Sequence, residues 1–379
     1  MTASRRSLLA AAALGLSAST PLGAAARDWK LGRPKGCRAR EAYVGAPLHP
    51  QLRDEVFVQA AAAGGTKLRQ AIQDRIDDTF DRLVPHGRPE IVAGAAAAAD
   101  GALWNQVRGA PRGAEPTRFL WPGLRDACLA AAVVQAAEEG KLSLEDRLSR
   151  WAPETPGAAV LKIDDLISHT SGLTAAAPAF CPGANWAEDP TDYSLLARIL
   201  QKIDGKPLHE SLTARIAERL MLEETTFLGP GQDVRGLARP QGFSAAEGEI
   251  AASSSDVVRV WRGLMAGRLH TEASVRTRFY RLYPVASRPD AFYGQGVMAF
   301  DRPRDTWLGY SGQGVGLSSL VAYSCRKQAF AAFTVVGDVP LDPIVEAIFA
   351  AMLAPGEPDP ALKKQTYIPP PPRRRRRRR

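Results

Sequence analysis

The segment IDDLISHTSGL, residues 163–173, places a histidine, a threonine and a serine directly before a glycine. A hydroxyl near an imidazole is the pattern of an activated nucleophile. A Ser-Gly pair after a short helix also suits a terminating turn, in which the hydroxyl hydrogen-bonds nearby backbone. The segment alone therefore leaves two interpretations of Ser171 and His169, chemistry or support, and the surrounding sequence has to decide between them.

Upstream of this segment the sequence predicts a helix, a hairpin and a second helix. Residues 67–84 carry apolar side chains at helical spacing, and residues 90–107 read as two strands joined by an Asp-Gly turn. Residues 124–142 form a strongly helical pattern that Gly140 ends at the C-terminus. The apolar face of the first helix consists of Leu68, Ile72, Ile76, Phe80 and Leu83.

Downstream, helices are followed by a run of strands. We expect helices at about 191–204, opened by Thr191 after a stop at Pro190, and at about 209–220. A further helix begins at Ser253, which has capping-box spacing to Asp256. Short strands and a closing helix are then predicted at 292–300, 306–312, 316–324, 329–338 and 341–354.

This order of elements predicts an α+β fold. Helix and hairpin come first, helices fill the middle, and strands with a final helix close the chain. The arrangement implies an antiparallel sheet completed by both chain ends and flanked by helices, with a mostly helical lobe inserted. The chain has 379 residues, of which 45% are hydrophobic and 23% charged, as expected for a soluble globular protein.

The first 26 residues read as a bacterial export signal of the twin-arginine type. Arg5 and Arg6 precede an apolar run to Leu16, and three alanines at 24–26 offer a cleavage site. We therefore expect a periplasmic or secreted protein without a transmembrane span in its mature part. Residues 27–66 form an extension that the sequence does not assign.

The net charge of +9 resides in the two ends of the chain. Arg5, Arg6 and the seven residues Arg373–Arg379 account for all of it, so the intervening residues are neutral. We therefore expect no positively charged nucleic-acid-binding surface on this part of the chain. Residues 356–379, rich in proline and arginine, are predicted to be a disordered tail. That tail either contacts anionic surfaces or is simply solvated.

The four cysteines are Cys37, Cys128, Cys181 and Cys325. In an oxidising compartment they allow up to two disulfides with three possible connectivities. Cys128 lies within an apolar helical pattern, which favours a buried thiol. The spacings fit no zinc or other metal motif, and we predict no cofactor.

Five phrases occur in the order TRFLW, AAEEGKLSLEDRLSRWAPE, IDDLISHTSGL, DYSLLARILQKIDGKPLHESL and GYSGQGVGLSSLVAY. Together they resemble the serine β-lactamase-like family, which includes class C β-lactamases, DD-peptidases and related esterases. The resemblance spans about residues 68–352 and implies one domain over residues 67–355. Each phrase is weak alone, and their shared order makes the signal specific.

The resemblance implies that His169 and Ser171 are structural, because the family's nucleophile lies earlier, in a Ser-x-x-Lys motif at the start of a long helix. Serine and lysine at i and i+3 share a helix face, so the amine reaches the hydroxyl proton. Counting back from Gly140 puts Gly123 at the serine position and Asp126 at the lysine position. Neither reactive group is present.

The other two family motifs are also altered. The Tyr-x-Asn position corresponds to Glu188-Asp189-Pro190, with a carboxylate for the phenol and a proline for the amide. The Lys/His-x-Gly motif corresponds to Tyr310-Ser311-Gly312, which retains the glycine alone. The degenerate positions are Gly123, Asp126, Glu188, Pro190, Tyr310 and Gly312.

No replacement motif is evident elsewhere. The one Ser-x-x-Lys, Ser324 to Lys327, falls in a charged turn between two predicted strands, and we interpret it as coincidence. GYSGQG resembles a nucleophile elbow, but Gln313 breaks the pattern. None of the five histidines accompanies a serine in a recognisable nucleophile context.

These observations favour an exported, catalytically inactive homologue that binds a cell-wall fragment, a small molecule or another protein without a covalent step. With Asp126 and Glu188 in the cleft, we expect neutral or cationic ligands. The alternative is an active hydrolase of divergent mechanism, for example with these two carboxylates as an acid–base pair. A third hypothesis is an interaction module whose Arg373–Arg379 tail contacts anionic lipids or polymers.

Overall fold

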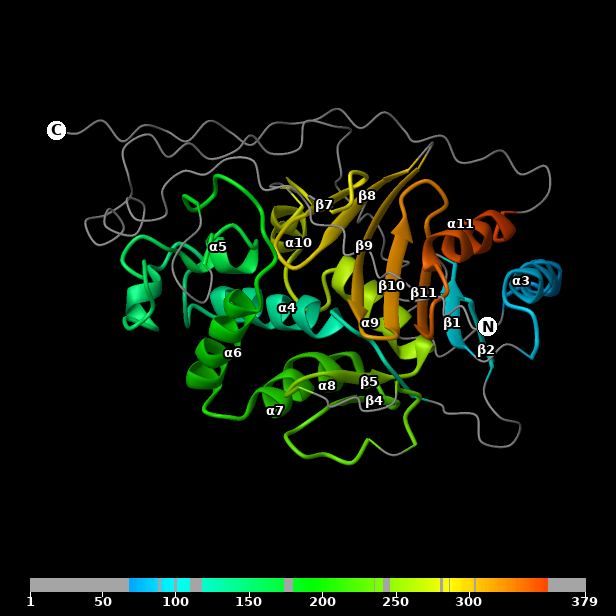
Figure 1. Ribbon diagram of the computed structural model, residues 1–379, viewed down its shortest axis with the longest axis horizontal. Helices are drawn as coiled ribbons and strands as arrows, with labels where there is room; N and C mark the ends of the chain where they lie inside the picture. The colour runs from blue at the N-terminus through cyan, green and yellow to red at the C-terminus, as the bar shows by residue number, and fades with distance from the viewer. Residues whose placement is uncertain are drawn as a thin grey trace, which may run out of the picture.

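The computed structural model describes residues 68–87, 90–98, 101–109, 118–173, 180–234, 236–240, 246–279, 282–285, 287–302 and 305–353. Within these residues the main feature is an eight-stranded antiparallel sheet in the order β2-β1-β11-β10-β9-β8-β7-β6 (Figure 1). The predicted export signal, the 27–66 extension and the 356–379 tail lie outside the described residues. The strands are β1 Ile91–Ala97, β2 Leu103–Arg108, β6 Tyr283–Pro284, β7 Ala291–Tyr293, β8 Met298–Arg302, β9 Asp305–Gly314, β10 Leu317–Ser324 and β11 Ala329–Val336.

The two ends of the described chain complete this sheet, as predicted. The N-terminal hairpin β1–β2 pairs with β11, so the first and last strands are neighbours. Helices α3 (Gln70–Leu83) and α11 (Leu341–Ala351) pack on each other and cover one face. Phe80 of α3 meets Phe333 of β11, and Phe349 of α11 meets Trp307 of β9. The apolar face of the first helix is therefore the one that seals the sheet.

The opposite face carries α9 (Ser254–Met265) and the helical lobe (Figure 1). A second, three-stranded sheet has the order β3-β5-β4. The remaining elements are β3 Phe119–Leu120, α4 Leu124–Glu138, η2 Leu148–Arg150, α5 Ile163–Ile167, α6 Pro190–Asp204, α7 Leu208–Leu212, the π-helical turn Thr213–Ala217, α8 Glu218–Leu220, β4 Thr225–Phe227, β5 Ile250–Ala252 and α10 Glu272–Arg278.

Helix α4 runs through the middle of the molecule. It is buried around most of its circumference, which suits its alanine-rich, apolar sequence. Gly140 adopts a left-handed conformation (φ +70°) just beyond it, as expected for a helix stop. Cys128 in this helix is buried, as predicted. Cys128 and Cys325 are free thiols and Cys181 is disulfide-bonded, while Cys37 lies outside the described residues.

One predicted helix start requires correction, and another is confirmed. Helix α6 begins at Pro190, not after it, and its cap is Asp189, whose carboxylate accepts a hydrogen bond from the Thr191 backbone N–H at 2.8 Å. Proline suits the first helical position because that N–H needs no intrahelical partner. Ser253 caps α9 as predicted, accepting from the Asp256 N–H at 3.2 Å.

The carboxylate of Asp256 does not complete the capping box. It accepts instead from the Glu224 N–H at 2.8 Å and from the Thr225 hydroxyl at 2.9 Å. This side chain therefore ties β4 to the start of α9.

None of the described helices combines the length and the apolar composition that a membrane crossing requires.

Candidate functional site

Gly123 is the cap of α4 and directly contacts β9. Its φ of +76° is a conformation that glycine adopts without strain. A Cβ at this position would lie 2.9 Å from Gly312 Cα and 3.0 Å from Tyr310 Cε1. The space that a side chain would need at the start of α4 is therefore filled by the backbone of β9 and an aromatic ring.

Gly312 makes the reciprocal approach from the sheet. A Cβ on Gly312 would lie 1.9 Å from the Pro122 carbonyl oxygen, so only glycine allows β9 to come this near. Gly312 pairs with Ser319 of β10, and the Ser319 hydroxyl donates to the same Pro122 oxygen at 2.8 Å. The helix start is thus held against two adjacent strands.

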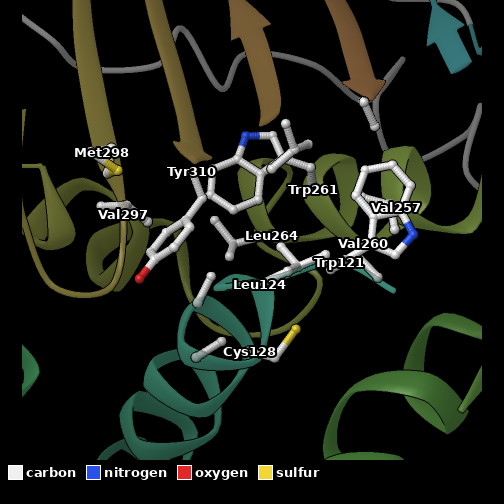
Figure 2. Packing of buried hydrophobic residues seen from close by; sticks show 14 of the residues in the cluster. Trp121, Leu124, Cys128, Val257, Val260, Trp261, Leu264, Val297, Met298 and Tyr310 are labelled. Carbon is white, nitrogen blue, oxygen red and sulfur yellow. The ribbon is translucent and has the colours of Figure 1, made fainter. Parts of the chain in front are cut away.

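Tyr310 covers the first turn of α4, beside Leu124 (Figure 2). Its side chain is buried, and its hydroxyl lies 3.5 Å from that of Tyr293. Tyr293 is 2.9 Å from the hydroxyl of Tyr193, which donates to the Ile167 carbonyl at 3.0 Å. Burial, followed by the charge of Asp126, holds the pKa of Tyr310 well above its ordinary value, so its phenol is neutral at physiological pH.

The two acidic motif positions differ in environment. Asp126, in the first turn of α4, forms an ion pair with its neighbour Arg125 at 3.0 Å between Nε and Oδ1. Burial lowers the pKa of Arg125, but the charges of Asp126 and Glu249 outweigh it and the net shift is upward. Glu188 is exposed and lies near enough to Tyr310 to raise the pKa of that phenol.

The structure therefore brings Gly123, Tyr310 and Gly312 into contact, with Asp126 one turn along the same helix. Glu188 is within electrostatic reach of this group. Pro190 is the first residue of α6, where it has a conformational role. Among the described residues, no group of three or more His, Cys, Asp or Glu side chains is arranged to hold a metal ion.

The His-Thr-Ser-Gly segment forms a buried structural cluster around Asp192. His169 Nδ1 lies 3.0 Å from Asp192 Oδ2, and the Ser171 hydroxyl donates to Asp192 Oδ1 at 2.6 Å. The Ser171 oxygen also accepts from the Leu173 N–H at 2.9 Å. In a catalytic triad the imidazole stands between hydroxyl and carboxylate. Here the carboxylate stands in the middle, so this geometry supports the loop and does not activate the serine.

Burial dominates the ionisation of Asp192. It raises the pKa of Asp192, although hydrogen bonds from His169 and Ser171 work in the opposite direction. The His169 ring also packs against Tyr193 and Tyr293, with centroid distances of 4.8 and 5.1 Å. The His-Thr-Ser-Gly segment therefore packs against Tyr193 and Tyr293, whose hydroxyl groups lead on to that of Tyr310.

Ser324 and Lys327 lie in the turn between β10 and β11. The buried Ser324 hydroxyl donates to Asp305 Oδ2 at 2.6 Å and accepts from the Lys327 N–H at 3.0 Å. Lys327 Nζ is 3.7 Å from the same carboxylate oxygen of Asp305. These bonds close a tight turn, which agrees with interpreting this Ser-x-x-Lys as coincidental.

Sequence reasoning missed a buried cation behind the site. Arg278 is fully buried and donates to the carbonyls of Gln295 at 2.7 Å and Gly296 at 3.1 Å. Burial lowers the pKa of Arg278 to about 10, and burial with the nearby Arg278 charge lowers that of His270 to about 3. Helical periodicity carries no signal for such a residue, because a buried arginine interrupts the apolar pattern that would reveal it.

Comparison with known proteins identifies the family. The family model described as Beta-lactamase matches residues 127–353, well over half of the chain. The chain belongs to the beta-lactamase family. The match begins after the first turn of α4, so it includes Glu188, Tyr310 and Gly312 but neither Gly123 nor Asp126.

The chain shares 22% identity over 197 residues with PbpX of Bacillus subtilis (strain 168), which is named as a penicillin-binding protein. That alignment covers 43% of this chain and 50% of PbpX, so the chain spans about half the length of this curated relative.

Solved structures of the same fold include a D-stereospecific amidohydrolase from Streptomyces sp., with 21% identity and a TM-score of 0.61 over 73% of this chain and 98% of that one. A penicillin-binding protein from Bacillus halodurans has 18% identity and a TM-score of 0.60 over 73% and 99%. These likenesses establish the beta-lactamase-type fold: a mixed α+β architecture in which helices flank an antiparallel sheet.

Proposed function

We propose that this protein is an exported member of the beta-lactamase family that has lost acyl-transfer chemistry and acts by non-covalent binding. The observation that carries the proposal is the contact at Gly123. The resemblance places the nucleophile there, yet a side chain at this position would meet Gly312 Cα at 2.9 Å and Tyr310 Cε1 at 3.0 Å. Acyl transfer through a serine needs both the hydroxyl and space for a substrate carbonyl beside it.

The charges around this contact support the same proposal. Asp126 stands at the lysine position of the Ser-x-x-Lys motif, and Tyr310 stands at the Lys/His position of the Lys/His-x-Gly motif. The phenol of Tyr310 stays neutral. A general base for a serine and a cation for a substrate carboxylate are both absent from these two positions. A ligand that approaches the start of α4 beside β9 meets Glu188 and the ion pair of Asp126 with Arg125. The net charge of these three side chains is negative, which favours neutral or cationic molecules such as uncharged cell-wall fragments.

Covalent labelling tests the proposal directly. Purified full-length protein is incubated with a fluorescent penicillin and, separately, with nitrocefin and a p-nitrophenyl ester. We expect no fluorescent band, no penicilloyl mass increase and no hydrolysis above buffer, whereas an active serine β-lactamase treated in parallel reacts. A penicillin bound covalently to any side chain would overturn the proposal and favour the alternative, a hydrolase of divergent mechanism.

The acid–base alternative has less support from the geometry. It requires Asp126 and Glu188 to act as a pair across a substrate, with one of them protonated. Asp126 is instead bound to Arg125 at 3.0 Å, and Glu188 is exposed. A p-nitrophenyl glycoside tests this alternative, because an active carboxylate pair would hydrolyse it without forming a covalent penicillin adduct.

A further inference from the structure

A cavity of about 370 Å³ lies at the other end of α4 from Gly123. The C-terminal ends of α4 and α6 form one wall, and the segment 208–220 forms the other. Helix α4 has 15 residues, so the cavity and Gly123 are separated by about 20 Å of helix. The cavity has the size of a small-molecule site and is distinct from the altered cleft.

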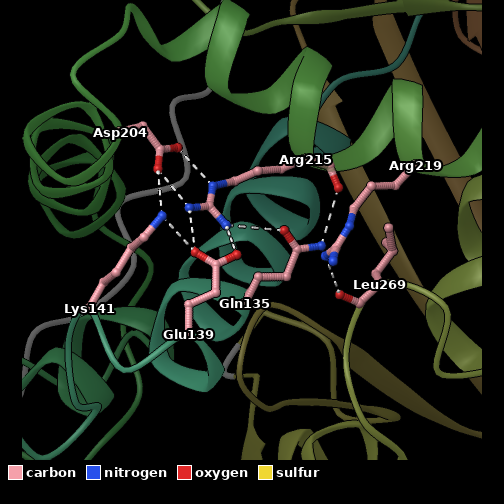
Figure 3. Close-up of polar contacts among 7 residues, drawn as sticks. All are labelled: Gln135, Glu139, Lys141, Asp204, Arg215, Arg219 and Leu269. Carbon is pink, nitrogen blue, oxygen red and sulfur yellow. Dashed lines mark hydrogen bonds and ion pairs between the residues drawn. The ribbon is translucent and has the colours of Figure 1, made fainter.

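Arg215 lines this cavity and holds its two carboxylates, Asp204 and Glu139, together (Figure 3). Its guanidinium donates to both oxygens of Asp204, at 2.7 and 2.6 Å, and to both oxygens of Glu139, at 3.0 and 3.1 Å. Lys141 Nζ adds an ion pair to Glu139 at 2.8 Å. The two carboxylates are therefore fully engaged by cations of the protein and have little capacity left for a ligand.

The pKa values of both carboxyl groups agree with this engagement. Burial raises the pKa of Asp204 and of Glu139, but hydrogen bonds from Arg215 outweigh it and the net shift is downward in each case. The Ser211 hydroxyl, on the same wall, is 1% exposed. It makes no hydrogen bond of ordinary geometry among the described residues, although it lies near enough to Asp204 to contribute to that lowering.

Two cations of the cavity, Lys206 and Arg219, have no carboxylate partner among the residues that the structure describes. Both are exposed, and Arg219 donates to the Leu269 carbonyl at 3.2 Å. With Lys141 and Arg215, the lining carries four cations against two carboxylates. Because the carboxylates are already engaged, the charge left for a ligand is positive.

The backbone of this wall is also irregular. Residues Thr213–Ala217 form a π-helical turn, a rare conformation that is often found at functional sites. Gln135 of α4 secures the turn, since its Nε2 donates to the Arg215 carbonyl at 3.2 Å and its Oε1 accepts from the Arg215 guanidinium at 3.4 Å. The backbone of Thr213–Ala217, which carries Arg215 and leads into Arg219, is thus fixed by Gln135 independently of any ligand.

We propose that this cavity binds a small organic or inorganic anion bearing a carboxylate or phosphate group. Lys206 and Arg219 contact the anion, while Arg215, Asp204 and Glu139 line the cavity beside it. This site is independent of the proposed loss of acyl transfer, because none of its residues touches Gly123 or Tyr310.

Isothermal titration calorimetry with inorganic phosphate and with succinate, at constant ionic strength, tests the site in the full-length protein. We expect saturable binding of at least one probe, and the preferred probe identifies the anion class. Lys206→Gln and Arg219→Gln should each weaken binding about three- to tenfold, and the double variant should abolish it. Arg82→Gln, which removes the same charge from an exposed position on α3, is the matched control and should bind normally.

Two results would overturn the proposal. One is the lack of saturable binding of both probes at millimolar concentration. The other is unchanged affinity in the Lys206→Gln/Arg219→Gln double variant. In the second case a lowered melting temperature would show that the two cations serve only the negative ends of α4 and α6. Both side chains are exposed, so the variants should fold, and circular dichroism verifies this.

Discussion

Gly123 and Gly312 meet backbone to backbone, so that a Cβ added to Gly123 would lie 2.9 Å from Gly312 Cα. One glycine opens the central helix and the other lies on the strand that passes over it. Under the proposed function, this contact occupies the position where the family resemblance expects a reactive side chain. The ring of Tyr310 completes the closure from above (Figure 2).

Replacing Gly123 by alanine should lower the free energy of unfolding more than the same substitution at another glycine with positive φ. Gly123→Ala adds both backbone strain and a steric clash, and we expect a loss of about 2–4 kcal/mol in the free energy of unfolding. Gly140→Ala is the matched control, because Gly140 has a φ of +70° but nothing within 4 Å of its added Cβ. That control should lose about 1–2 kcal/mol, from strain alone. Urea denaturation of both variants measures the difference, and equal losses would contradict the close contact.

Restoring the family residues should not restore labelling by penicillin. In the Gly123→Ser/Asp126→Lys variant the new hydroxyl lies under the Tyr310 ring, where a substrate carbonyl cannot approach it. We expect no covalent adduct by intact-protein mass spectrometry, even where the variant folds. Rapid acylation of this variant would mean that Tyr310 moves aside easily and that the cleft is open in solution.

Arg215 should determine how stability responds to acid. Its partners Asp204 and Glu139 have lowered pKa values in the folded state, so their contribution is present at neutral pH and disappears as pH falls through those lowered values. Arg215→Gln should cost about 2–4 kcal/mol at neutral pH, because Asp204 is largely buried and loses its partner. The variant should also lose less stability than the wild type below about pH 4.5.

Denaturation at a series of pH values tests this prediction. Arg198→Gln is the control, because Arg198 and Glu154 form an ion pair in which both side chains are more than half exposed. Solvent screens such a pair, so its removal should change stability little. Parallel pH profiles for wild type and Arg215→Gln would contradict the assignment.

Cys128 should resist alkylation in the folded protein. It is 2% exposed, and burial raises its pKa to about 12, so almost no thiolate is present at about pH 8. Iodoacetamide should leave Cys128 unmodified under native conditions and modify it fully in guanidinium, as read by peptide mass spectrometry. Native modification at a rate near that of free cysteine would mean that α4 opens frequently.

Several elements could be predicted from the sequence because their causes are local. The apolar spacing from Leu68 to Leu83 predicts the helix that seals the sheet, and Gly140 marks the end of the central helix. The cap at Asp189 was missed because a proline at the first helical position looks like a stop when read alone. The two-residue strands β3 and β6 were missed because so few residues show no alternation.

The sequence by itself determined the order of the elements and the family resemblance, because these depend on residue identity and spacing along the chain. The same spacing underlies our hypothesis that the family's reactive groups are missing at Gly123, Asp126 and Tyr310. Only the tertiary structure decided that Gly312 and Tyr310 fill the space at Gly123, that Asp192 stands between His169 and Ser171, and that a cationic cavity lies at the far end of α4. The physical reason is distance along the chain. Gly123 and Gly312 are far apart in sequence, and the contact between them exists only after β9 has docked on the start of α4.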